Sequence, residues 1–286
     1  MSEKIIITCD STADLGVKLA ERYNIPIVPL SVTLGDKTFK DGVDITPEEL
    51  YSYVERTGEL PKTTATNIGE YIDFFKKYTE QGYTVVHFAF CSKMSSTYTN
   101  ACLAAEEIEN VYVIDTKNLS SGSGLLVLAG CDMLEKGLSA KEIADKCTEL
   151  VPFVDASFVI DNLDYLHKGG RCSALSVLGA NLLKLKPCIM VKDGVMGVEK
   201  KYRGKFTDIA KEYIKERLQN IDDIDKSRIF LTHAGYDEDF MNELCEYIKS
   251  LDIFDEVFLI RAGCTISSHC GRECLGVLFI RKSPVA

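Results

Sequence analysis

The clearest structural signal in the chain is YTVVHFAFCSKMSSTY, which runs from Tyr83 to Tyr98. Tyr83–Phe90 is apolar enough to be a buried parallel strand, and a serine-rich segment follows it. Ser95 and Ser96 stand where we expect a helix to begin, because serine is favoured at helix N-caps. A helix N-terminus also offers free N–H groups to an anion. This stretch therefore predicts a strand, a loop and a helix whose first residues either cap the helix or bind an anion.

The same alternation of strands and helices continues through residues 1–150. Apolar runs predict strands at Lys4–Cys9, Ile27–Leu34 and Val111–Asp115. Capping patterns predict helices at Asp14–Tyr23 (after Ser11-Thr12), from Thr46-Pro47-Glu48-Glu49, from Asn67-Ile68-Gly69-Glu70 and from Ser120-Ser121. Such alternation is typical of a doubly wound, mostly parallel sheet. Ligands of that architecture gather at the carboxyl ends of the strands.

The pattern changes after residue 150. Lys192-Asp193-Gly194 lies between the apolar runs Cys188–Val191 and Val195–Glu199, which indicates a hairpin. Further strands are predicted at Phe158–Asp161, Ile229–Thr232, Val257–Ile260 and Gly276–Ile280, and helices at Phe206–Leu218 and Glu238–Ser250. We expect an α/β domain over 1–150, of which segment 60–80 is able to pack on the second domain. A mixed α+β domain then covers 151–286, with a boundary at Leu150–Phe153 and the ligand between the two.

Composition restricts the class of partner. A net charge of −10 over 286 residues argues against a nucleic-acid ligand, because phosphates would be repelled. The start of the chain has no basic, apolar signal-peptide pattern, and its apolar runs are shorter than 18 residues. We therefore expect a cytoplasmic protein without stable membrane insertion. Its eleven cysteines are read as free thiols in a reducing compartment.

Polar groups suited to one carboxylate occur at widely separated positions. Thr63 and Thr64 lie in the threonine-rich segment before residue 68, and Ser95 follows the buried strand. Arg171 ends a Gly-Gly-Arg turn, and His269 lies in a predicted loop between two strands. Each has an ordinary structural interpretation when taken alone. Together they suit an anion that leaves bulk water, which needs donors from several directions.

Two catalytic or regulatory alternatives remain open. A hydrolase or acyl-transfer enzyme would use Ser95 and His269, although no G-x-S-x-G elbow is present. A thiol- or metal-dependent regulator would use Cys264, Cys270 and Cys274, whose spacing forms no paired C-x-x-C motif. Walker and G-x-G-x-x-G nucleotide loops are also missing. We expect no metal and no cofactor.

Five motifs in order along the chain resemble those of the DegV family, the fatty-acid-binding subunits that serve bacterial fatty acid kinase. They are Asp10–Leu15, Lys62–Asn67, Ser92–Tyr98, Leu166–Ser173 and Ser268–Val277. The resemblance implies a two-domain protein that holds a long-chain fatty acid such as palmitate or oleate in an apolar tunnel. It also implies a non-catalytic protein, which presents the carboxylate to an ATP-dependent kinase subunit.

The resemblance also implies roles for individual residues. Thr63 and Ser95 would bind the carboxylate with Thr64 and Ser96 beside them, and His269 would join this network. Arg171 would add positive charge, and Arg203 with Lys201 would dock the kinase.

Three positions depart from the family pattern. Ser96 replaces a glycine, Arg272-Glu273 replaces Pro-Gly, and Thr66-Asn67 replaces Pro-Ser. None of these changes removes an expected carboxylate ligand.

Overall fold

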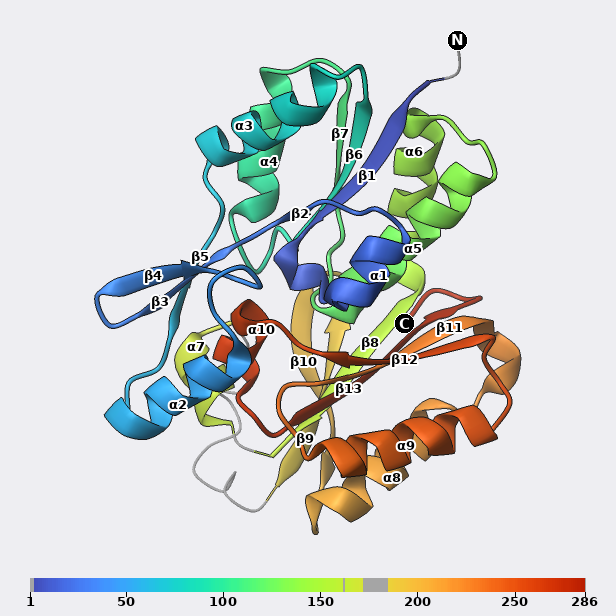
Figure 1. Cartoon of the computed structure of the whole chain (residues 1–286). Coiled ribbons are helices and arrows are strands. Elements are labelled where there is room, and N and C mark those ends of the chain that lie inside the picture. The colour runs from blue at the N-terminus through green and yellow to red at the C-terminus, as the bar shows by residue number, and fades with distance from the viewer. Residues whose placement is uncertain (1–2, 162, 172–184, 286) are drawn as a thin grey trace.

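The computed structural model describes residues 3–161, 163–171 and 185–285. Its N-terminal part is built on a parallel four-stranded sheet with the order β2-β1-β6-β7 (Figure 1). The strands are β1 (Ile5–Asp10), β2 (Ile27–Val28), β6 (Thr84–Ala89) and β7 (Val111–Asp115). All six residues of β6 are buried, as expected for a strand covered on both faces. The predicted parallel sheet is therefore confirmed.

Helices cover both faces of this sheet. Two of them, α3 (Ile68–Thr79) and α4 (Thr97–Glu106), pack together on one face, and α5 (Ser121–Glu135) and α6 (Ala140–Leu150) pack on the other (Figure 1). The predicted start of α3 is confirmed, because Asn67 and Glu70 form a reciprocal capping box. Helix α5 is buried along most of its length because it also packs on the second large sheet.

The second large sheet is mixed and has the order β10-β9-β8-β13-β11-β12. Its strands are β8 (Val154–Ile160), β9 (Lys186–Lys192), β10 (Val195–Tyr202), β11 (Ile224–His233), β12 (Glu256–Arg261) and β13 (Cys274–Arg281). Only β11 and β12 pair in parallel within this described sheet. Helices α8 (Phe206–Arg217) and α9 (Glu238–Ser250) lie along it (Figure 1). The fold is thus a doubly wound parallel sheet followed by a mixed α+β unit.

A small antiparallel sheet lies beside the two large sheets, and distant segments of the chain meet at it (Figure 1). It consists of β3 (Ser31–Leu34), β4 (Lys37–Lys40) and β5 (Lys62–Thr64). Around it lie α2 (Pro47–Thr57), α7 (Asp164–Gly169) and α10 (Cys264–Cys270) (Figure 1). Because α10 contacts both β3 and β5, a helix from the end of the chain meets residues from its first quarter.

Three local predictions were wrong. Ile27–Leu34 is two strands in different sheets, interrupted at Pro29-Leu30. The first helix, α1 (Gly16–Arg22), begins after a 3₁₀ turn, because the Ser11 hydroxyl bonds Asp41 and the Leu30 N–H instead of capping it. His269 lies in α10 and not in a loop, because the Asp41 carboxylate accepts the first N–H groups of that helix.

Two further points concern the described part of the chain. Cys172 and Ser173, which end the fourth family motif, lie outside the described residues. Among the residues that the structure describes, none of the helices has the length and apolar composition needed to span a bilayer.

Candidate functional site

A cavity of about 280 Å³ opens at the carboxyl end of β6, between the two large sheets. Its walls come from the loop after β6, from β5, α7 and α10, and from β10. The described lining residues are Leu30, Thr63, Thr64, Ala65, Phe90, Met94, Ser95, Ser96, Leu119, Leu166, Arg171, Met196, Thr265, Ile266, His269 and Cys270. Tertiary structure thus collects residues as far apart in the chain as Leu30 and Cys270.

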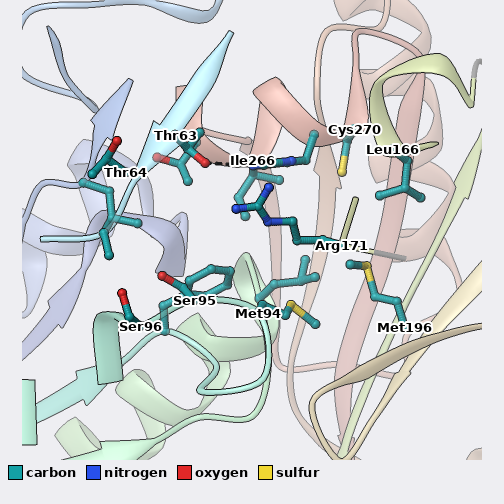
Figure 2. A pocket seen from close by; sticks show the side chains of 16 residues that line it. Thr63, Thr64, Met94, Ser95, Ser96, Leu166, Arg171, Met196, Ile266 and Cys270 are labelled. Atoms are coloured by element: carbon teal, nitrogen blue, oxygen red, sulfur yellow. Dashed lines mark hydrogen bonds between the residues drawn. The ribbon is translucent and has the colours of Figure 1, made fainter. Parts of the chain in front are cut away.

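All six residues predicted to bind the ligand line this one cavity: Thr63, Thr64, Ser95, Ser96, Arg171 and His269. Figure 2 shows the threonines and serines along one side, with the Arg171 guanidinium between them and the opposite wall. Met94, Leu166, Met196 and Cys270 lie toward that opposite wall. The cavity therefore has a hydroxyl-rich end and an apolar, sulfur-rich end.

Thr63 and His269 form a direct hydrogen bond across the cavity. Thr63 Oγ1 lies 2.9 Å from His269 Nε2. Thr63 is half-buried, whereas its neighbour Thr64 is exposed, since successive strand residues point to opposite faces. The other ring nitrogen of His269, Nδ1, is buried and has no hydrogen-bond partner among the described residues.

His269 is held as a neutral imidazole. Burial, helped by the nearby positive charge of Arg171, lowers the pKa of His269 to about 4. Close packing fixes the ring, because a Cβ added at Gly169 would lie only 2.5 Å from His269 Nδ1. Glycine at this position of the Gly-Gly-Arg turn therefore allows the imidazole to approach the backbone of α7.

Ser95 and Ser96 differ in their local contacts. Ser95 Oγ accepts the Thr97 N–H at 3.2 Å and lies 2.6 Å from Thr97 Oγ1. Ser96 occupies the N-cap position of α4, but its side chain makes no capping hydrogen bond. The Ser95 oxygen thus supports the start of α4, and its side chain borders the cavity. Its role in binding an anion stays a prediction.

Arg171 is the only charged side chain among the described lining residues. It follows Gly170, whose φ of 69° ends α7 in the left-handed conformation and turns the chain. Its Nη1 donates to the Gly169 carbonyl at 2.6 Å. The remaining guanidinium N–H groups make no hydrogen bond to another described residue, so the positive end of the cavity suits an anion.

Sequence reasoning did not identify the apolar walls. Met94 and Met196 come from a loop and from a predicted strand, and Leu166 and Ile266 come from α7 and α10. Because periodicity shows only that a residue is apolar, it does not separate core positions from cavity walls. A second cavity of about 30 Å³ continues behind Leu119, Ile266 and Cys270, which line both spaces.

Polar residues at two other strand ends support the site instead of lining it. Asp10 is buried and accepts hydrogen bonds from Tyr71 and from the Phe90 N–H. Asp115 accepts the N–H and the hydroxyl of Ser92. Both carboxylates hold the first residues of the loop that carries Ser95.

The described geometry does not assemble the two alternative sites. Ser95 bonds Thr97, and His269 Nε2 bonds Thr63, so the nitrogen that a catalytic base would use is directed at a different hydroxyl. The Cys264 thiol contacts the Ile45 carbonyl, and burial raises its pKa well above the ordinary value. Among the described residues, no group of three His, Cys, Asp or Glu side chains is placed to hold a metal ion.

The proposed docking residues lie apart from the cavity. Lys201 is near the end of β10, and Arg203 directly follows that strand. Both are exposed, and the described residues include no ion-pair partner for either. Met196 of the same strand lines the cavity, so the two cations lie on the order of 20 Å from it along β10.

Comparison with known proteins places the whole chain in one family. Residues 4–282 match the DegV family model. A DegV domain-containing protein of Clostridium acetobutylicum is 34% identical over 284 residues, which span 98% of this chain and 99% of that protein.

Two solved structures are similar over the same length. A fatty-acid-binding DegV family protein of Thermus thermophilus has a TM-score of 0.89 and 27% identity, and the match covers 97% of this chain and 99% of that one. A stearic-acid-binding protein of Eubacterium ventriosum has a TM-score of 0.84 and 31% identity, covering 97% and 98%. Since the family match and these similarities extend over both large sheets and the cavity between them, the chain belongs to the DegV family.

Proposed function

We propose that the cavity binds a long-chain fatty acid, with its carboxylate at the hydroxyl-rich end and its acyl chain along the apolar wall. This proposal rests on the separation of polar and apolar side chains along a single cavity. Thr63, Ser95 and Arg171 gather at one side, and Met94 and Met196 lie at the other (Figure 2). The solved relatives of Thermus thermophilus and Eubacterium ventriosum, which bind fatty acids, support the same ligand class.

Hydrogen-bond direction makes Thr63 a donor to the carboxylate. A buried unpaired N–H is costlier than an unpaired lone pair, so the partnerless Nδ1 of His269 favours the tautomer with its proton on Nε2. That proton is donated to Thr63 Oγ1, across the 2.9 Å contact. The Thr63 hydroxyl proton is then free for the ligand.

Ser95 provides the second donor by the same reasoning. Its oxygen accepts the Thr97 N–H and lies 2.6 Å from the Thr97 hydroxyl, which we assign as the donor in that contact. The Ser95 proton therefore remains for the carboxylate, and Arg171 adds the opposite charge. Hydrogen bonds to a charged group contribute about 1.5–3 kcal/mol each.

The acyl chain supplies most of the affinity. Each buried CH₂ contributes roughly 0.8 kcal/mol, so about 15 methylenes contribute on the order of 12 kcal/mol before the costs of ordering and association. The smaller cavity behind Leu119 and Ile266 extends the path for the chain end. The polar cluster then selects a carboxylate head group, because it removes the penalty for burying an anion.

We further propose that the protein is a carrier without catalysis of its own, which presents the carboxylate to an ATP-dependent kinase subunit. Lys201 and Arg203 are exposed cations without an ion-pair partner in the described part of the chain, and they support a docking surface on an otherwise acidic protein. Their separation from the cavity leaves the carboxylate end open to the kinase. A Ser95–His269 hydrolase receives no comparable support, because the two side chains bond other residues.

Lipid analysis tests fatty-acid binding. The wild type purified under mild conditions should carry about one long-chain fatty acid, identified by mass spectrometry of the extract. Ser95→Ala should weaken binding of added fatty acid by about tenfold or more, because it removes a charge-assisted donor. Ser52→Ala, an exposed serine on α2, is the matched control and should bind as the wild type does. Equal affinity of all three proteins would refute the assigned head-group site.

Kinase docking has a separate test. Arg203→Ala and Lys201→Ala should slow phosphorylation of bound fatty acid by the kinase subunit while fatty-acid affinity stays at the wild-type value. Lys18→Ala, an exposed lysine on α1, controls for the loss of one positive charge. Phosphorylation at the wild-type rate by both docking variants would contradict this surface.

A further inference from the structure

Two buried carboxyl groups, Asp14 and Asp41, meet at the start of α10 without lining the cavity. Asp41 accepts the N–H of Cys264 at 2.7 Å and the N–H of Thr265 at 3.1 Å. Asp14 accepts the N–H of Gly263 at 2.8 Å. Three successive N–H groups at the beginning of the helix that carries His269 are therefore held by two carboxyl groups.

The two carboxyl groups lie around the same glycine. A Cβ added at Gly263 would lie 3.1 Å from Asp14 Oδ1 and 3.1 Å from Asp41 Oδ1. Both acids are nearly inaccessible, with Asp14 5% and Asp41 3% exposed. Two negative charges so close together in a water-poor space repel strongly, and such pairs retain a proton.

Both carboxyl groups belong to the N-terminal part of the fold, whereas α10 lies between two strands of the second large sheet. Asp14 follows the first 3₁₀ turn, and Asp41 follows β4. Ser120 donates to Asp14 Oδ2 at 2.5 Å and adopts a φ of 51°, which is unfavourable for a buried non-glycine residue. Such a conformation persists only where the surroundings hold it firmly. The contacts of Asp14 thus join three separate segments.

We propose that Asp14 and Asp41 are positioning residues that hold α10, and with it His269, against Thr63, and that this hold depends on a proton that Asp14 retains beside Asp41. The predicted effect on ligand binding rests on the proposed fatty-acid function. The structural part of the inference, the attachment of α10, is testable without a ligand.

The charges around the pair agree with a retained proton. Burial raises the pKa of Asp14 to about 8, with the Asp41 charge acting in the same direction and the hydrogen bonds from Ser120 and Gly263 opposing it. The other titratable groups that face the pair are the thiols of Cys9 on β1 and Cys264 on α10, both with raised pKa, so both stay neutral. Glu48 and Glu49 of α2 also act on Cys264, and Glu48 is paired with Arg261 at 2.8 Å.

Raising the pH should therefore loosen α10. Below about pH 8, Asp14 retains its proton. Above that pH Asp14 becomes negatively charged beside Asp41, and the repulsion opposes the arrangement that caps the helix. If binding requires the protonated form, the affinity falls with the fraction of that form. The Kd for a fatty acid should then rise by about tenfold between pH 7 and pH 9.

The binding experiment compares three proteins with a fluorescent long-chain fatty acid at pH 7 and pH 9. The wild type and Asp73→Asn, an exposed control on α3, should both show the tenfold rise in Kd. Asp14→Asn keeps a neutral group of the same shape and should show nearly equal Kd at the two pH values. His269, with its pKa about 4, does not titrate in this interval. The same pH dependence in all three proteins would overturn the inference.

A ligand-free measurement separates this inference from the proposed function. Amide hydrogen exchange of α10 in the wild type should speed up between pH 7 and pH 9 by more than that of α9 in the same molecule, which corrects for the intrinsic effect of pH. Failure of every protein to bind fatty acid would count against the proposed function alone. Equal acceleration of exchange in α10 and α9 would refute the dependence of the α10 attachment on the Asp14 proton, whatever the binding result.

Discussion

His269 lies at the edge of the cavity as a neutral imidazole, bonded through Nε2 to Thr63 and packed through Nδ1 against Gly169. A cationic imidazole would repel Arg171 and has little access to water, so the folded protein resists its protonation. Neutrality is therefore a property of the folded environment. It lets the ring orient the Thr63 hydroxyl without adding a charge to the site.

This burial predicts an acid-dependent loss of stability. The pKa of His269 is about 4 in the folded state and near 6.5 when unfolded, so the unfolded chain binds more protons between these values. The free energy of unfolding should fall as the pH is lowered from 6.5 to 4, by roughly 3 kcal/mol in total from this residue. Urea denaturation of the wild type and of His269→Asn at each pH measures this loss of stability.

Comparison of the wild type with His269→Asn removes the contribution of the other titrating groups. His233 also has its pKa lowered to about 4 by burial, and it contributes to both proteins equally. The stability difference between the wild type and His269→Asn should therefore narrow on acidification. A difference that stays constant from pH 6.5 to pH 4 would contradict the assigned pKa.

At the scale of elements, the hairpin of β9 and β10 is seated on the loop that carries Ser95. Asp193 and Gly194 at its turn have φ of 44° and 74°, as a two-residue type I′ turn requires. Lys93 and Lys117 both form ion pairs with Asp193, and the Cys91 thiol contacts the Gly194 carbonyl. The turn thus joins the second sheet to the polar end of the cavity.

Gly194→Ala should disturb the contact between the turn of the β9–β10 hairpin and the loop that carries Ser95. The left-handed φ of the residue already disfavours a side chain, and the new Cβ would lie 2.8 Å from Cys91 Sγ. Gly58→Ala is the matched control, because Gly58 has a φ of 73° and open space around it. We expect about 1 kcal/mol of destabilisation for Gly58→Ala and about 1–3 kcal/mol more for Gly194→Ala, measured by urea denaturation. Equal losses of stability in the two variants would show that the hairpin turn does not pack closely against Cys91.

At the scale of the whole molecule, the cavity lies between both large sheets. One apolar core contains Phe88 of β6, Leu125 of α5 and Leu278 of β13, so the two sheets are packed through α5. The proposed fatty acid would contact residues from β5, α7, α10 and β10 at once. Binding should therefore stabilise the molecule as a unit.

Removal of lipid should lower the melting temperature of the whole protein. A ligand at a hundred times its Kd stabilises the folded state by about 2.7 kcal/mol, which corresponds to a shift of roughly 5–10 °C for a chain of this size. Calorimetry of the protein before and after delipidation, and after addition of oleate, measures the shift. An unchanged melting temperature after complete delipidation would argue against a buried acyl chain.

The local part of the fold was predictable from the sequence. Thr46 and Glu49 form the expected capping box of α2, Asn67 and Glu70 form that of α3, and the turn after Lys192 makes the expected hairpin. These features depend on residues within a few positions of one another, where spacing and residue type decide the conformation. The motifs also located six residues that line one cavity.

The sequence by itself therefore determined the alternation of strands and helices, their caps, and the positions of the polar groups. Only tertiary structure decided that His269 belongs to a helix, because the capping carboxylate of Asp41 comes from 223 positions earlier in the chain. Only tertiary structure made that imidazole neutral and placed the apolar walls opposite Thr63 and Ser95. The physical reason is that burial, desolvation and cavity shape arise from contacts between distant segments, which no local pattern encodes.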